Sequence, residues 1–261
     1  MELGKVTALM KATALEVAIL TGHLVLYPSG IVAERLSPAP TSVGGGRRPV
    51  VLLHGFVDNR SVFVLLRRSL ARHGRDHIES LNYSPLTCDL RAAAELLGRR
   101  VDEISARTGH AEVDVVGHSL GGLIARYYVQ RLGGDSRVRT LVTLGTPHAG
   151  TTVAPLADAH PLVRQMRPGS EVLRELAGPA GGCRTRLVSF WSDLDQVMVP
   201  VETARLDHPD LLVHNVRVSG IGHLALPVHP TVAAGVREAL DAGGPVGTAT
   251  SEEGTGAASV A

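Results

Sequence analysis

Residues 113–130 read VDVVGHSLGGLIARYYVQ, and this stretch contains the pattern that decides the fold. The largely apolar run at 112–116 predicts a buried strand, and the apolar spacing over 120–132 predicts a helix. Between them lies a G-x-S-x-G motif, Gly117 to Gly121, with Ser119 at its centre. A strand–turn–helix setting for this motif is typical of a nucleophile elbow, in which a sharp turn lifts the serine above the sheet. Glycines flank Ser119 because a Cβ at either position would collide across the turn.

Strand and helix signals alternate along the chain on both sides of this motif. We expect strands at 49–53, 77–83, 112–116, 138–144, 186–191 and 211–218, and helices at 61–73, 89–108, 120–132 and 231–241. The clearest helix is 89–108, where apolar residues recur at intervals of three or four positions. Such alternation predicts an α/β fold whose sheet of about six strands is mainly parallel and covered by helices on both faces.

The chain of 261 residues divides into three expected segments: residues 1–46, a catalytic domain at 47–242, and a tail at 243–261. The first segment holds an apolar stretch at 13–27 (TALEVAILTGHLVLY) and a linker that ends in three glycines. Residues 243–261 are mostly Gly, Ala, Ser and Thr and lack the apolar pattern of a core, which predicts a disordered tail.

The apolar stretch at 13–27 predicts an amphipathic helix that packs on the body or lies on a membrane surface. Glu16, Thr21, Gly22 and His23 break it, so it is shorter than the roughly 20 apolar residues of a membrane span. A cleavable signal peptide and an uncleaved anchor remain alternatives, although no clear cleavage site follows. Secretion and a cytoplasmic or peripheral membrane location are both compatible with this segment.

Charge and composition exclude several kinds of partner and cofactor. The chain has 26 basic and 25 acidic side chains, and this balance argues against a protein that binds the phosphate backbone of nucleic acids. His73 and His77 are four residues apart, but no HExxH glutamate accompanies them, so no metal site is predicted. The chemistry expected of Ser119 needs no cofactor.

A serine hydroxyl needs a base to remove its proton, and in elbow-containing folds the base follows an acid late in the chain. His223 is the expected base, because it stands in the glycine-flanked loop SGIGH directly after the strand 211–218. The acid should follow the preceding strand, where the loop offers Asp193 and Asp195. We favour Asp195, which lies further out toward the histidine loop.

Two backbone N–H groups are expected to stabilise the oxyanion that forms on the substrate. One belongs to Leu120, the residue after the nucleophile. The other belongs to Phe56, in the loop that follows the first core strand, where Gly55 permits close approach. We interpret His54 and His118 as structural supports of this region.

The connection at 149–182 is much longer than the usual two to six residues between strand and helix. It leaves the same edge of the sheet as Ser119 and contains short apolar stretches broken by proline and glycine. We expect a small cap over an acyl pocket; an ordinary crossover helix with decorated loops is the alternative. The residues expected to touch an acyl chain are Leu156, Leu162, Met166 and Leu173.

Five segments taken in order resemble bacterial triacylglycerol lipases and esterases of the α/β-hydrolase fold. They lie at 51–63, 113–130, 140–151, 192–200 and 220–226, and the resemblance covers residues 49–240. It implies Ser119 as nucleophile, Asp195 as acid, His223 as base, and Phe56 and Leu120 as oxyanion donors. It also implies that the stretch 145–148 shapes the pocket without taking part in catalysis.

The expected activity is therefore hydrolysis of an acyl ester or lipid by a serine triad through an acyl-enzyme intermediate. A thioesterase or acyltransferase on the same fold is the alternative within enzymes, because this fold hosts all three reactions. A non-catalytic ligand-binding protein of this fold would be expected to lack a triad member, and none is missing here. The expected partners are a small acyl ester or lipid and, through the N-terminal helix, a lipid interface.

Overall fold

A computed structural model describes residues 3–31, 46–56, 58–83, 89–152 and 160–242. Six strands form one sheet in the order β2-β1-β3-β4-β5-β6, and every neighbouring pair is parallel. The strands are β1 (Val50–Leu53), β2 (Ile78–Leu81), β3 (Val113–His118), β4 (Val138–Leu144), β5 (Arg186–Ser192) and β6 (Leu212–Val218). The expected α/β sheet of six strands is confirmed. Its strand order reverses direction beside β1, so the loops that follow β1 and β3 lie next to each other at this switch point.

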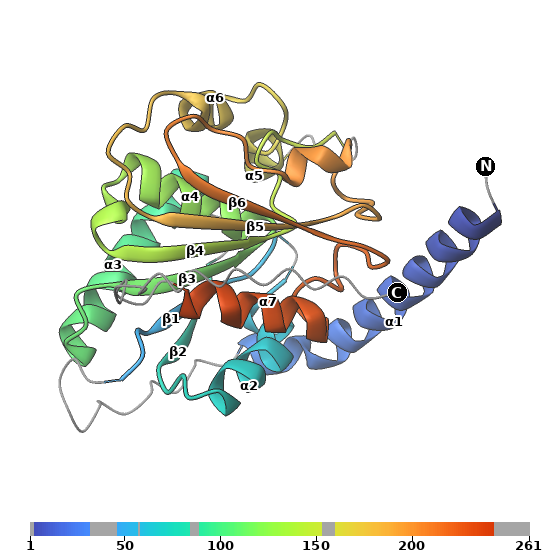
Figure 1. Ribbon diagram of the computed structural model, residues 1–261, viewed down its shortest axis with the longest axis horizontal. Helices are drawn as coiled ribbons and strands as arrows, with labels where there is room; N and C mark the ends of the chain where they lie inside the picture. The colour runs from blue at the N-terminus through green and yellow to red at the C-terminus, as the bar shows by residue number, and fades with distance from the viewer. Residues whose placement is uncertain (1–2, 32–45, 57, 84–88, 153–159, 243–261) are drawn as a thin grey trace, which may run out of the picture.

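Helices cover both faces of the sheet (Figure 1). The helices α3 (Leu90–Thr108) and α4 (Leu120–Arg131) pack together on one face, and α2 (Val64–Arg72) and α7 (Pro230–Asp241) pack on the other. Two short helices, α5 (Pro161–Gln165) and α6 (Glu171–Ala177), occupy the long connection after β4. The remaining short elements are the 3-10 helices η1 (Arg60–Phe63), η2 (Gly134–Ser136) and η4 (Val201–Ala204).

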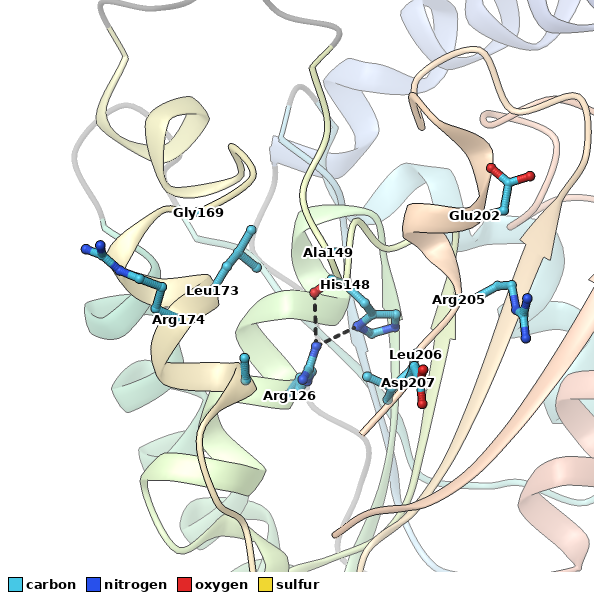
Figure 2. A pocket seen from close by; sticks show the side chains of 11 residues that line it. Arg126, His148, Ala149, Gly169, Leu173, Arg174, Glu202, Arg205, Leu206 and Asp207 are labelled. Atoms are coloured by element: carbon cyan, nitrogen blue, oxygen red, sulfur yellow. Dashed lines mark hydrogen bonds between the residues drawn. The ribbon is translucent and has the colours of Figure 1, made fainter. Parts of the chain in front are cut away.

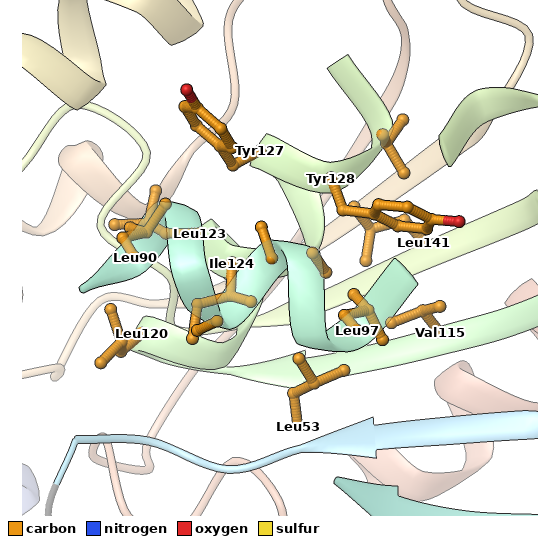
Figure 3. Packing of buried hydrophobic residues seen from close by; sticks show 14 of the residues in the cluster. Leu53, Leu90, Leu97, Val115, Leu120, Leu123, Ile124, Tyr127, Tyr128 and Leu141 are labelled. Carbon is orange, nitrogen blue, oxygen red and sulfur yellow. The ribbon is translucent and has the colours of Figure 1, made fainter. Parts of the chain in front are cut away.

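The period of two along each strand divides the core into two clusters. In β1, Val51 and Leu53 belong to the cluster under α3 and α4, whereas Val50 and Leu52 belong to the cluster under α2 and α7. Figure 3 shows Leu53, Val115 and Leu141 of neighbouring strands beneath the side chains of α3 and α4. All four β1 residues are fully buried, so this strand is fixed from both faces and holds the loop that follows it.

The N-terminal helix α1 (Leu3–Ile31) is longer than the apolar stretch that predicted it. Its N-terminal end projects from the body, and its later turns run along the body beside η1 (Figure 1). The helix is not amphipathic in the expected sense. Ala12 and His23 are buried against the body, while Met10, Val25 and Ile31 are exposed. Small and polar side chains thus face the protein together with Ile19, which packs against the cluster under α2 and α7.

Candidate active site

Ser119 stands in the tight turn between β3 and α4. Its φ of 53° makes it the sole non-glycine residue with positive φ in the part of the chain that the structure describes. A Cβ on Gly117 would come within 2.5 Å of the Gly122 nitrogen, and one on Gly121 would overlap the Leu53 carbonyl oxygen. Only glycine fits on either side of the serine, so the motif fixes the strained turn that the sequence predicted.

The backbone of this turn is held from the neighbouring strand. The Ser119 N–H donates to the Leu144 carbonyl at 2.9 Å, and the Thr146 hydroxyl donates to the Ser119 carbonyl at 3.0 Å. A Cβ on Gly122 would overlap that threonine side chain, so α4 begins in direct contact with the loop after β4. The role of Thr146 could not be assigned from the sequence beyond its place in the stretch 145–148.

His223 and Asp195 meet at the carboxyl edge of the sheet. The His223 Nδ1 lies 2.8 Å from Asp195 Oδ2, and both side chains are almost fully buried. The other carboxylate oxygen, Oδ1, accepts hydrogen bonds from the N–H groups of Val197 and Met198 at 2.9 and 3.1 Å. Asp193 instead binds Arg217 and Ser219 at the surface. Of the two candidate acids, the geometry therefore brings Asp195 to the histidine.

The surroundings of His223 set its protonation. Burial lowers the pKa of the imidazole, but the charge and hydrogen bond of Asp195, with Glu16 and Asp58 further away, outweigh it and raise the pKa above its ordinary value. A base must be neutral to accept a proton. The fraction of His223 able to act as a base therefore falls as the pH drops below this raised pKa.

His54 and His118 support the site from behind. The His54 ring stacks on Tyr83 at 4.4 Å, and the Tyr83 hydroxyl donates to the His54 carbonyl at 2.5 Å, which fixes the loop after β1. The His118 Nε2 lies 3.3 Å from the His223 carbonyl oxygen, and its Nδ1 lies 3.6 Å from Asp58. Sequence reasoning missed Asp58, whose only signal was its place five residues after the first strand.

Phe56 and Leu120 carry the two N–H groups predicted as oxyanion donors, and both residues lie close to Ser119. Leu120 is the first residue of α4, so its N–H is among the terminal groups that no carbonyl of the same helix accepts. Phe56 lines the same cavity as Ser119 and His223, and its ring meets the edge of the His160 ring at 4.8 Å. Two N–H groups aimed at one point beside Ser119 would stabilise a negative oxygen, and this role of Phe56 and Leu120 stays a prediction.

A cavity of about 220 Å³ opens above Ser119 and is bordered by His223. We call it the acyl pocket. Its apolar lining includes Phe56, Pro147, Val163, Met166, Met198 and Leu224. This is smaller than the roughly 300–1,000 Å³ of sites that enclose a drug-sized ligand.

Of the four expected acyl contacts, Met166 lines this pocket. Leu162 and Leu173 do not: Leu162 is fully buried in the core, and Leu173 borders the second cavity described below. The reason is the phase of α5: Val163 and Met166 are three residues apart and lie on one side of the helix, where they border the pocket as well as the core, whereas Leu162 contacts the core alone. Val163 is therefore a pocket residue that the sequence analysis missed. Leu156 lies outside the described residues.

A second cavity, of about 480 Å³, lies between α6 and the loop around η4 and does not include Ser119 (Figure 2). At its floor, buried Arg126 donates to the His148 carbonyl at 3.2 Å and to the Leu176 carbonyl at 2.9 Å. Burial, with the nearby charge of Arg131, lowers the pKa of Arg126 to about 10. Arg126 thus ties α6 and the stretch 145–148 to α4, so this part of the connection is fixed to the body.

No group of three His, Cys, Asp or Glu side chains that could hold a metal ion occurs within the residues the structure describes. The chemistry available at the acyl pocket is that of a hydroxyl, an imidazole, a carboxylate and backbone N–H groups.

The family model described as palmitoyl protein thioesterase matches residues 49–198, which hold β1 to β5, Ser119 and Asp195. The chain belongs to this family. The match ends before His223, so the family assignment does not depend on this histidine. The sheet order, the elbow and the long connection after β4 agree with an α/β-hydrolase fold.

Other relatives place this family member among proteins named lipases. A triacylglycerol lipase of Burkholderia plantarii is 29% identical over 157 residues, which are 58% of this chain and 42% of that protein. One of Pseudarthrobacter phenanthrenivorans is 30% identical over 115 residues, 41% of this chain and 35% of that protein. The chain thus spans less than half the length of these curated relatives. The crystal structure of Aspergillus fumigatus lipase B shares the fold with a TM-score of 0.67 at 19% identity, covering 78% of this chain and 55% of that one.

Proposed function

We propose that the chain is a serine carboxylic-ester hydrolase, a lipase or esterase, that acts on acyl esters through Ser119, His223 and Asp195. The observation that carries this proposal is the buried 2.8 Å contact between His223 and Asp195 beside a pocket that also holds Ser119. A nucleophile, a base and an orienting acid around one apolar pocket are the parts that acyl transfer requires.

The reaction follows from these positions. His223 Nε2 takes the Ser119 proton as Oγ attacks the ester carbonyl carbon, and the N–H groups of Phe56 and Leu120 stabilise the oxyanion. The proton then passes from His223 to the departing alcohol oxygen, and the acyl group stays on Ser119. Water loses a proton to His223, attacks the acyl-enzyme and releases the carboxylic acid. Asp195 holds the imidazole and stabilises its charged form in both steps.

A thioesterase is the second candidate, and the family match favours it. The same groups would cleave a thioester, with a thiol as the leaving group. A panel of p-nitrophenyl esters from acetate to palmitate, with and without a detergent interface, set against thioesters of matched acyl length, separates the two. Transfer of the acyl group to an added alcohol instead of water would identify an acyltransferase. A folded protein that turns over none of these substrates, and that a fluorophosphonate does not label, would refute the hydrolase and favour a ligand-binding role.

We propose that the described parts of the segment, residues 149–152 and 160–182, form a cap over the acyl pocket. Its start is bound to the loop of the acid, since the Thr151 hydroxyl donates to the Val197 carbonyl at 2.6 Å. The Thr151 N–H donates to the Met166 carbonyl at 2.9 Å, which holds α5 beside the pocket.

Met166→Trp should shorten the pocket. We expect hydrolysis of a long-chain ester to fall about tenfold relative to acetate, since excluding one to two methylenes from an apolar site costs about 0.8 kcal/mol each. Leu173→Met, at the other cavity, is the matched control and should leave the ratio of long- to short-chain rates unchanged. If folded Met166→Trp kept the wild-type ratio of long- to short-chain rates, the cap segment would have no role in selecting the substrate.

We also propose that α1 contacts a lipid surface. Residues Met10–Ile31 form a helix long and apolar enough to cross a membrane, and this helix directs Glu16 and His23 toward the body. The side chains of Leu24 and Val25 are 66% and 74% exposed. Those of Val17 and Ile31, two turns before and after Leu24, are exposed as well. So many exposed apolar side chains on one helix favour an apolar environment, and lipid acyl chains supply one.

The full chain should therefore float with phosphatidylcholine vesicles in a density gradient. The double variant Leu24→Lys and Val25→Lys should stay at the bottom while it still hydrolyses a short soluble ester. Glu95→Lys on α3 adds the same net charge at an exposed site away from α1 and should float like the wild type. Vesicle binding by the double variant at the wild-type level would contradict the proposed lipid contact.

A further inference from the structure

Helix α1 makes direct polar contacts with the loop that holds His223. The two carboxylate oxygens of Glu16 accept hydrogen bonds from the N–H groups of Leu224 and Ala225, at 2.8 and 2.9 Å. These are the two residues that follow His223. A glutamate from the first thirty residues of the chain thus binds the backbone of the catalytic loop, 208 and 209 positions away in sequence.

The loop needs these contacts. A turn begins at His223, whose carbonyl accepts the N–H of Leu226 at 3.3 Å, so the N–H groups of the two residues between them point out of the turn. Ala225 is almost fully buried, and an unpaired N–H there would be unfavourable. A carboxylate that accepts both bonds is a stronger partner than a neutral acceptor.

The contact is also closely fitted. A Cβ on Gly222, the residue before His223, would come within 2.5 Å of the Glu16 carboxyl carbon. The backbone on one side of His223 therefore makes room for the carboxylate, and the backbone on the other side donates to it.

A second polar residue of the same helix begins a series of contacts that leads to His223. His23, two turns after Glu16, lies 3.8 Å from Asp58, which lies 3.6 Å from His118. The His118 Nε2 lies 3.3 Å from the His223 carbonyl oxygen. Helix α1 is thus connected to the His223 carbonyl indirectly, through Asp58 and His118, and to the two residues after His223 directly, through Glu16.

We infer that Glu16 is a positioning residue: it holds the His223 loop in the geometry that lets the imidazole reach Ser119, so α1 completes the active site. The inference rests on the proposed function, because it assigns a role relative to a catalytic His223. It also gives the polar inner face of α1 a purpose that differs from contact with lipid. Helix α1 would therefore both contact lipid and order the loop of the catalytic base.

Two substitutions of Glu16 test this in the full-length protein with a soluble short-chain p-nitrophenyl ester. Glu16→Ala removes both acceptors and should lower kcat by up to about 10²-fold with little change in KM, since a small displacement of a catalytic group has an effect of this size. Glu16→Gln keeps one acceptor oxygen, so its kcat should fall less than that of Glu16→Ala. Glu95→Gln, an exposed glutamate on α3, is the control for the lost charge and should behave as the wild type.

The pH profile separates positioning from a purely structural role. The charged groups near His223 are Asp195, Asp58 and Glu16, with the His118 ring beside it, and Glu16 is one of the charges that raise the His223 pKa. Both Glu16 variants should therefore shift the acidic midpoint of kcat/KM to lower pH. A lower melting temperature with wild-type kcat and an unmoved midpoint would show that Glu16 only stabilises the fold, and would overturn the inference.

A double-mutant cycle with Gly222→Ala gives a second test. In the wild-type background the new methyl group displaces the Glu16 carboxylate and should lower kcat; in the Glu16→Ala background it has room and should cost less. Additive losses of kcat in the double variant would count against the inference.

Two measurements on the wild type, ester turnover and fluorophosphonate labelling of Ser119, distinguish failure of the proposed function from failure of the inference about Glu16. If both are absent the proposed function fails, whereas if both are present and the Glu16 variants match the wild type only the inference fails.

Discussion

Ser119→Ala should fold and lose ester hydrolysis by about 10⁶-fold in kcat, because the members of a triad act as a unit and the nucleophile has no substitute. The other hydroxyls that line the acyl pocket, those of Thr151 and Thr152, are engaged with the carbonyls of Val197 and Val199. The measurement is kcat on a short p-nitrophenyl ester, paired with fluorophosphonate labelling and identification of the labelled peptide. Label on another residue, with activity retained in the variant, would contradict the triad.

Ser119→Gly provides the matched control for this variant. Alanine keeps the Cβ that is strained at a φ of 53°, whereas glycine adopts this conformation without penalty. Both variants should be inactive, but Ser119→Gly should be more stable than Ser119→Ala by about 1 kcal/mol in denaturant titrations. Equal stabilities would mean that the turn stores no strain at the serine.

The sequence predicted the sheet well because the signals for its strands are local. The bounds of β4 agree with the expected 138–144, and β5 and β6 differ by one residue at one end. Each of these strands is an apolar or alternating run between turn residues, which needs no tertiary information. The elbow was equally local, since Gly117, Ser119 and Gly121 are contiguous with the strand and helix that define it.

The features of the site that the sequence did not predict depend on contacts between distant segments of the chain. Glu16 read as a polar break in an apolar stretch, and nothing near it in sequence indicates that its partners are Leu224 and Ala225. The sequence analysis predicted Leu162 and Leu173 as pocket residues because the long connection after β4 identified the right segment. It could not predict which side chains face the pocket, because packing sets the orientation of helices only five or seven residues long. Asp58 needed the position of His118, which only the fold provides.

Asp195→Asn should lower kcat by roughly 10⁴-fold, the loss expected when the orienting acid of a triad becomes an amide. The structure gives the reason. Oδ1 of Asp195 accepts from two backbone N–H groups, so the asparagine oxygen must take this place and its NH₂ group must face His223. An NH₂ donor opposite Nδ1 forces the imidazole to carry its proton on Nε2. The nitrogen that should accept the Ser119 proton is then already protonated.

Asp193→Asn is the matched control, two residues away on the same loop. Its carboxylate binds Arg217 at 2.7 Å and Ser219 at 3.1 Å and does not face His223, so kcat should stay within a few-fold of the wild type. Steady-state kinetics on one short ester at a pH where His223 is neutral compares the two variants directly. Because the substitution at Asp195 changes the tautomer and not the pocket, KM should change little while kcat falls. If Asp193→Asn carried the large loss and Asp195→Asn the small one, the acid would be Asp193, and the buried contact to His223 would have no catalytic role.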